Sequence, residues 1–142
     1  MNADEERHLR RAIALAGEAR AAGNPPFGSL LVGADGAVLA EDRNTTVADD
    51  DITAHPELKL ARWAARSLPP DEAAATTMYT SCQPCGMCAG AIARSGLGRV
   101  VYALSAEQLD AIKPPDQVPR EVRQDGPHLY DEARAPVTAY YR

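Results

Sequence analysis

The stretch Cys82-Gln83-Pro84-Cys85-Gly86-Met87-Cys88 holds all three cysteines of the chain and joins a strand-like run, 76–81, to a short helical run, 86–94. Cysteines in this spacing make a poor disulfide framework and a good metal or redox cluster. Cys85 and Cys88 stand three residues apart at the start of the expected helix, so their thiols share one face of its first turn. A helix N-terminus favours the thiolate, which is a zinc ligand. The stretch therefore predicts a strand-to-helix turn that presents two metal ligands.

A second stretch, Thr53-Ala54-His55-Pro56-Glu57, opens another expected helix, 55–67, and Pro56 suits the first turn of a helix. If both helix starts meet at one edge of a sheet, His55 joins Cys85 and Cys88 as a third ligand. Three protein ligands leave a fourth position open for water, which is the pattern of catalytic zinc. Glu57 does not lie on the same helix face as His55. We expect its carboxylate beside the open fourth position of the metal, where it can move protons.

Two other readings of the cysteines remain open at this point. Cys82 could complete a closed site with four protein ligands, which would make the zinc structural. The overlapping C-x-x-C pairs could instead be a redox motif. Against both, we expect Cys82 at the end of a strand as a small packed residue, and neither reading gives Glu57 a role.

Outward from these motifs, the pattern alternates between helix and strand. An amphipathic helix is expected over 4–22, and two strands, 27–33 and 37–41, flank the turn signal Ala34-Asp35-Gly36. A last strand, 99–104, leads into a helix, 105–112. This order predicts an α/β fold of three layers, with a central mixed sheet flanked by helices. The first two strands are expected to be antiparallel, and the later ones, which are joined through helices, to be parallel.

The chain has 142 residues, which we interpret as one domain, 1–142. It is 45% hydrophobic and carries a net charge of −5, so a nonspecific nucleic-acid binder is not expected. No apolar run is long enough for a membrane span, and the charged N-terminus is not a secretory signal. These two absences, together with three cysteines that do not suit a disulfide framework, favour a cytoplasmic protein. Residues 113–127 are Pro-rich and irregular, and the tail after them is expected to be weakly helical and broken at Pro136.

The combination of His55-x-Glu57 with Pro84-Cys85-x-x-Cys88 resembles the signature of the cytidine/nucleobase deaminase superfamily. Pro26-Phe27-Gly28-Ser29-Leu30-Leu31-Val32 is similar to the first strand of its guanine deaminase and tRNA adenosine deaminase branches. The resemblance extends over roughly 12–103. Gln83 stands where both branches usually have Glu, and this leaves the branch open.

The resemblance implies a zinc-dependent hydrolytic deaminase with a cytidine-deaminase-like fold, acting as a homodimer on a free nucleobase or nucleoside of guanine or cytosine type. One alternative is deamination of adenosine in tRNA, although the arginines of the tail are balanced by acids. The other is a noncatalytic binding module stabilised by zinc. The implied zinc ligands are His55, Cys85 and Cys88, and the implied proton shuttle is Glu57. The implied substrate contacts are Asn44, Phe27 and backbone groups of Ala54 and Ser81.

Overall fold

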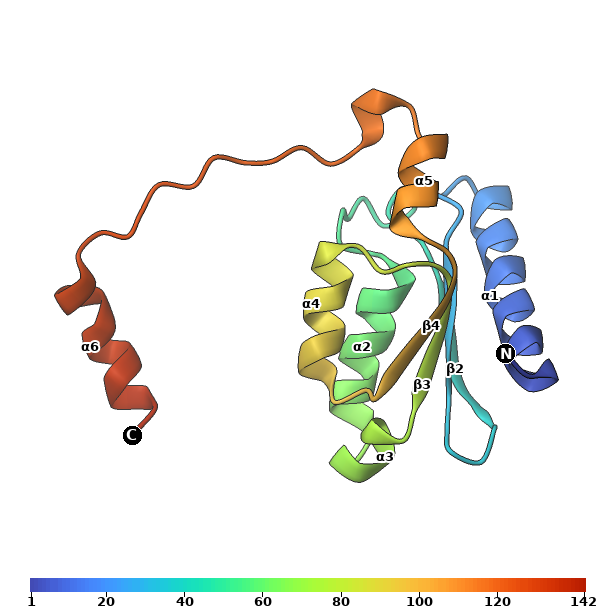
Figure 1. The fold of residues 1–142 in the computed structure, drawn as a ribbon, viewed down its shortest axis with the longest axis horizontal. Helices are drawn as coiled ribbons and strands as arrows, with labels where there is room; N and C mark the ends of the chain where they lie inside the picture. Colours follow the sequence, from blue (N-terminus) through green and yellow to red (C-terminus); the bar gives the residue numbers. More distant parts are fainter.

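A computed structural model describes all residues, 1–142. Its sheet has four strands in the order β2-β1-β3-β4. Figure 1 shows one helix, α1, on one face of the sheet, with α2 and α4 side by side on the other face. This is the expected α/β architecture of three layers. In chain order, the elements of this body are α1 (Ala3–Ala21), β1 (Gly28–Val32), β2 (Val38–Arg43), α2 (Pro56–Ser67), α3 (Pro70–Ala74), β3 (Thr77–Cys82), α4 (Gly86–Ser95), β4 (Arg99–Leu104) and α5 (Ala106–Ile112).

The strand directions correct one expectation. The pairs β1–β2 and β1–β3 are antiparallel, and only β3–β4 is parallel. Although α2 joins β2 to β3, β3 does not lie beside β2 but on the far side of β1. It therefore runs in the same direction as β2 and opposite to its actual neighbour. The short helix α3 was also not expected from the sequence.

The contact between α1 and the sheet depends on a glycine. A Cβ atom on Gly28 would lie 2.6 Å from the carbonyl oxygen of Ala12 and 2.6 Å from the backbone nitrogen of Ala16. Because these are backbone atoms, they cannot move aside cheaply. Gly28 thus allows α1 to lie close against β1, which is entirely buried.

The parallel pair β3–β4 places two functional segments at one edge of the sheet. Cys82 pairs with Leu104 at the ends of these strands, and the backbone N–H of Gln83 donates to the carbonyl of Leu104 over 2.7 Å. The cysteine segment after β3 and the helix after β4 therefore begin next to each other. In Figure 1, α5 stands at this end of the sheet.

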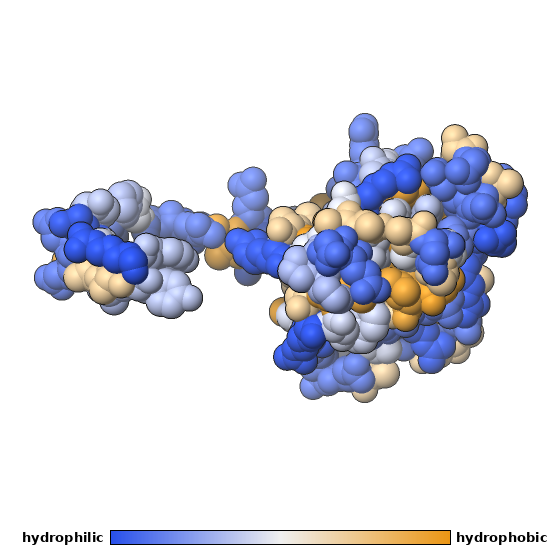
Figure 2. Space-filling model, turned by 90° about the horizontal axis from the view of Figure 1, so that it is seen from below, coloured by the Kyte–Doolittle hydropathy of each residue, from blue (hydrophilic) through white to orange (hydrophobic).

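The remaining residues, 113–142, leave the body as an arm. The arm contains a single 3-10 turn, Pro115–Gln117, and the helix α6 (Tyr130–Tyr140). None of its residues is buried, and Figure 2 shows it as a separate lobe. The expected break at Pro136 was wrong, because α6 runs through it. The carbonyl of Glu132, which loses its usual donor, lies in an exposed part of the helix where water can replace the bond.

Candidate zinc site

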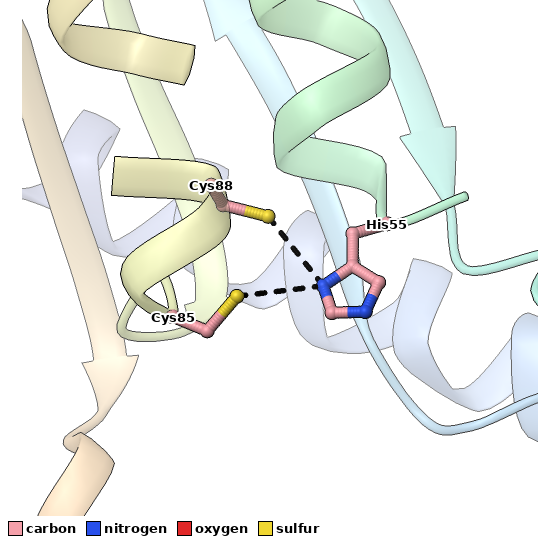
Figure 3. A group of neighbouring side chains, drawn as sticks. All are labelled: His55, Cys85 and Cys88. Atoms are coloured by element: carbon pink, nitrogen blue, oxygen red, sulfur yellow. Dashed lines mark hydrogen bonds between the residues drawn. The ribbon is translucent and has the colours of Figure 1, made fainter. Parts of the chain in front are cut away.

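Three side chains converge where α2 and α4 begin. His55 is the N-cap residue of α2, and Cys85 is the N-cap residue of α4. Cys88, one turn into α4, is completely buried. Figure 3 shows one nitrogen of the His55 ring facing both sulfur atoms. This nitrogen, Nδ1, lies 3.4 Å from Sγ of Cys88 and 3.7 Å from Sγ of Cys85.

These distances fit a shared metal ion. Zinc binds nitrogen at about 2.0–2.1 Å and sulfur at about 2.3 Å, which at a tetrahedral angle separates the two ligand atoms by about 3.6 Å. The two N···S distances lie on either side of this value, and all three ligand atoms lie within 4.8 Å of one another. The group therefore has the chemistry and the spacing for zinc, with Nδ1 as the histidine ligand.

The electrostatics of the group favour a thiolate at Cys85. Hydrogen bonds with Cys88 and then with His55 lower the pKa of the Cys85 thiol to about 3. The pKa of the Cys88 thiol is raised, first by its hydrogen bond with Cys85 and then by burial. The pKa of His55 is also raised, mainly by its hydrogen bond with Cys85, while the positive charge of Lys113 acts in the opposite direction. One thiolate is thus already favoured where a zinc ligand is needed.

Glu57 lies beside this group, in the first turn of α2. Its side chain is only 6% exposed, and burial is the main reason that its pKa is raised. It lines a small cavity, of about 60 Å³, together with His55 and Cys85. The cavity thus brings the expected proton carrier and two of the metal-binding side chains to one space.

The position of Cys82 bears on the closed-site alternative. Cys82 ends β3, is 5% exposed and lines the cavity, but it is not one of the three residues that could hold a metal. Burial raises the pKa of its thiol, which favours the neutral form. The structure therefore supports an open site with three ligands and does not form the closed site with four.

Of the four expected substrate contacts, only Phe27 lines the cavity. Asn44 is 1% exposed, and its Oδ1 accepts hydrogen bonds from the backbone N–H and the hydroxyl of Thr46, each over 2.9 Å. Ser81 accepts a hydrogen bond from the N–H of Gly28 over 3.1 Å. Ala54 accepts one from the N–H of Thr45 over 3.1 Å. Asn44 and Ala54 thus stabilise the loop between β2 and α2, and Ser81 joins β3 to β1.

Sequence reasoning missed three residues that line the cavity: Gln83, Leu109 and Lys113. Leu109 lies on α5, and Lys113 is the C-cap residue of this helix, four residues further on. The sequence contained part of the information that places these residues, because it predicted a helix that begins at Ser105. What was missing was the β3–β4 pairing that brings α5 beside the cysteine segment.

Comparison with known proteins agrees with this site. The sequence profile described as "Cytidine and deoxycytidylate deaminase zinc-binding region" matches residues 2–104. A guanine deaminase of Bacillus subtilis is 41% identical over 109 residues, which are 76% of this chain and 68% of that protein. A tRNA-specific adenosine deaminase of Haemophilus influenzae is 34% identical, with 76% of this chain and 62% of that protein covered. The chain thus spans slightly less than two thirds of the second relative.

The solved structure of a Bacillus subtilis guanine deaminase is also similar. It matches with a TM-score of 0.73 and 31% identity, over 99% of this chain and 94% of that one. The fold and the site together define a zinc-dependent hydrolase that removes amino groups from amidine-type carbons. The chain belongs to the cytidine and deoxycytidylate deaminase family. This membership removes the noncatalytic binding module from the alternatives.

None of the helices of this chain is both long and apolar enough to cross a membrane.

Proposed function

We propose that this deaminase acts on a free amino-bearing nucleobase, or its nucleoside, of guanine or cytosine type. The observation that carries the proposal is the group of His55, Cys85 and Cys88 at a small cavity that Glu57 also lines. The cavity, about 60 Å³, is small compared with most small-molecule sites. A cavity this small favours a ligand that enters it as a single base.

In this proposal His55, Cys85 and Cys88 bind the zinc ion. Zinc, when bound, would lower the pKa of a water molecule, so that the water gives up a proton readily and can attack the ring carbon at neutral pH. Glu57 takes a proton from this water and delivers it to the amino group, which leaves as ammonia. Its burial keeps the carboxyl group away from bulk water, so it can hold the proton between the two steps.

The remaining residues orient the ring. Phe27 and Leu109 provide apolar surface in the cavity. Asn44, with Oδ1 committed to Thr46, keeps its Nδ2 available for the edge of a base. For Asn44, and for backbone groups of Ala54 and Ser81, the proposal rests on resemblance to the family.

The test is ammonia release by the zinc-loaded protein from guanine, cytosine, adenine, their nucleosides and an anticodon stem-loop RNA. We expect release from a guanine- or cytosine-type compound. Release from the RNA alone would contradict the substrate proposal and favour the tRNA branch. The acidic net charge of −5 argues against that outcome.

We also propose that the chain forms a homodimer in the cytoplasm. Free cysteines support a reducing compartment. The aromatic side chains of α6 and its C-terminal end, Tyr130, Tyr140 and Tyr141, are 69%, 80% and 79% exposed, and this apolar surface supports self-association. Sedimentation velocity should show a dimer for the full chain and a smaller species for a chain that ends at residue 117. A full chain that stays monomeric would contradict the proposal.

A further inference from the structure

The chain has only two lysines, and the structure uses them differently. Nζ of Lys59 has three partners, the carboxylate of Asp42, the carbonyl of Arg43 and the hydroxyl of Thr45, each at 2.9 Å. Lys113 is half-buried and lines the cavity beside the zinc site, yet it makes no ion pair or side-chain hydrogen bond with the chain. Its ammonium group is therefore available to something that enters the cavity.

The position of Lys113 is fixed by the helix that precedes it. Ser105 and Gln108 form a capping box at the start of α5. Oε1 of Gln83 accepts a hydrogen bond from the backbone N–H of Ala106 over 2.9 Å, which ties α5 to the cysteine segment. Leu109 on this helix and Lys113 at its C-cap both line the cavity. The two acids of α5, Glu107 and Asp110, are exposed and do not line it.

An ammonium group has three hydrogen-bond donors and no acceptor. It can therefore donate to a carbonyl oxygen or to an unprotonated nitrogen of a bound ring, but not to an amino group. The substrate amine has to face Glu57 and the metal-binding group, so another edge of the ring is free to face α5. The small cavity favours an acceptor on the ring itself over a distant phosphate.

We propose that Lys113 is a specificity-determining residue, which donates a hydrogen bond to a keto oxygen of the substrate and so selects heterocycles with both a keto and an amino group. This inference rests on the proposed function and names the substrate class of that site. Guanine and cytosine belong to the class, whereas adenine, which has no keto oxygen, does not.

The direct test uses pairs of compounds that carry the same amino group with and without the oxygen: guanine with 2-aminopurine, and cytosine with 4-aminopyrimidine. The ratio of kcat/KM within each pair is measured for the zinc-loaded wild type and for Lys113→Met, Lys113→Arg and Arg120→Met. Arg120→Met removes one positive charge, as Lys113→Met does. Because Arg120 is exposed and has no ion-pair partner, this variant serves as the control for net charge. Zinc content and Tm are measured for each variant to detect a merely structural effect.

In Lys113→Met we expect the preference for the keto compound to fall about 10-fold, the range of a charge-assisted hydrogen bond at a partly solvated site. Lys113→Arg should retain most of the preference, and Arg120→Met should retain all of it. An equal loss for both members of a pair, or an unchanged ratio, would overturn the inference. Guanosine and cytidine monophosphates are assayed in parallel, and an effect of Lys113→Met confined to them would also overturn the inference, because Lys113 would then bind phosphate.

A binding measurement separates this inference from the proposed function. Hypoxanthine and purine differ by a keto oxygen and carry no amino group, so their binding, measured by competition in saturation-transfer NMR, does not depend on turnover. We expect hypoxanthine to bind more tightly to wild type and the difference to disappear in Lys113→Met. If no base is deaminated but this difference is found, the proposed function fails while the role of Lys113 stands. If bases are deaminated and the difference is absent, only the inference fails.

Discussion

The body of the molecule, residues 3–112, and the arm, residues 113–142, differ in how much side-chain surface they bury. All 28 buried residues lie between His8 and Ser95, and the arm has none. The ion pairs of the body include one that joins distant elements, Arg11 of α1 with Glu41 of β2. Those of the arm join near neighbours only, such as Arg123 with Asp125. The body thus contains the interactions that stabilise the fold. The arm begins at Lys113, which is the last residue along the chain to line the cavity.

The largest expected effect concerns the metal. Cys85→Ser should abolish zinc binding and deamination, because serine is a poor zinc ligand and only two ligands remain. Cys82→Ser is the matched control three residues earlier, and it should keep zinc because Cys82 is not part of the metal-binding group. Zinc per chain is measured by atomic absorption on the purified proteins. Equal loss of zinc in both variants would instead indicate the closed site with four ligands.

A second prediction compares one substitution in both regions. Leu31 is fully buried in β1, whereas Leu129 at the start of α6 is 71% exposed. Leu31→Ala should lower the free energy of unfolding by about 2–5 kcal/mol, since it removes core contacts and leaves a cavity. Leu129→Ala should change it by less than about 0.5 kcal/mol. Both values come from urea unfolding, and similar losses for the two variants would show that the arm is packed in solution.

The smallest expected effect is the loss of stability when the ion pair between α1 and β2 is removed. The guanidinium of Arg11 donates to Glu41 over 2.7 Å and holds the pKa of that carboxyl below its usual range. A lowered pKa in the folded state means that the stabilisation is present above the ordinary pKa of glutamate. It is lost as the pH falls through the lowered value.

Glu41→Gln should therefore cost up to about 1 kcal/mol at pH 7 and nothing in more acidic solution, because both groups are partly exposed. Asp125→Asn, in the local pair of the arm, serves as its control and should have no effect at either pH. Thermal unfolding at several pH values measures both. A cost for Glu41→Gln that persists in acid would mean that the lost interaction is not ionic.

The sequence predicted those parts of the fold that depend on local pattern. The helical run expected over 86–94 is α4, which ends at Gly96 with a positive φ of 91°, and the helix expected over 105–112 begins with a capping box at Ser105. The grouping of His55, Cys85 and Cys88 was expected because each ligand stands at a recognisable helix start. The roles of these residues, and the interpretation of 1–142 as one domain, remain proposals.

What the sequence did not predict depends on packing between distant segments. Nothing local shows that β3 lies next to β1, so its antiparallel pairing was missed. On α2, the buried side chains of Leu60 and Ala64 pack in one cluster with Leu31 of β1 and Met78 of β3, a contact between distant segments that no local pattern specifies. Lys113 was missed for the same reason, since only the sheet brings α5 to the cavity.

The central claim is that Glu57 moves protons at a zinc site formed by His55, Cys85 and Cys88. The most direct measurement is the rate of ammonia release by Glu57→Gln, loaded with zinc to the same stoichiometry as wild type, on the best substrate of the panel. Glutamine keeps the size of the side chain but cannot carry the proton. We expect kcat to fall by about 10²–10⁴ with zinc binding retained. A variant that keeps full zinc and a kcat within a few fold of wild type would contradict the account.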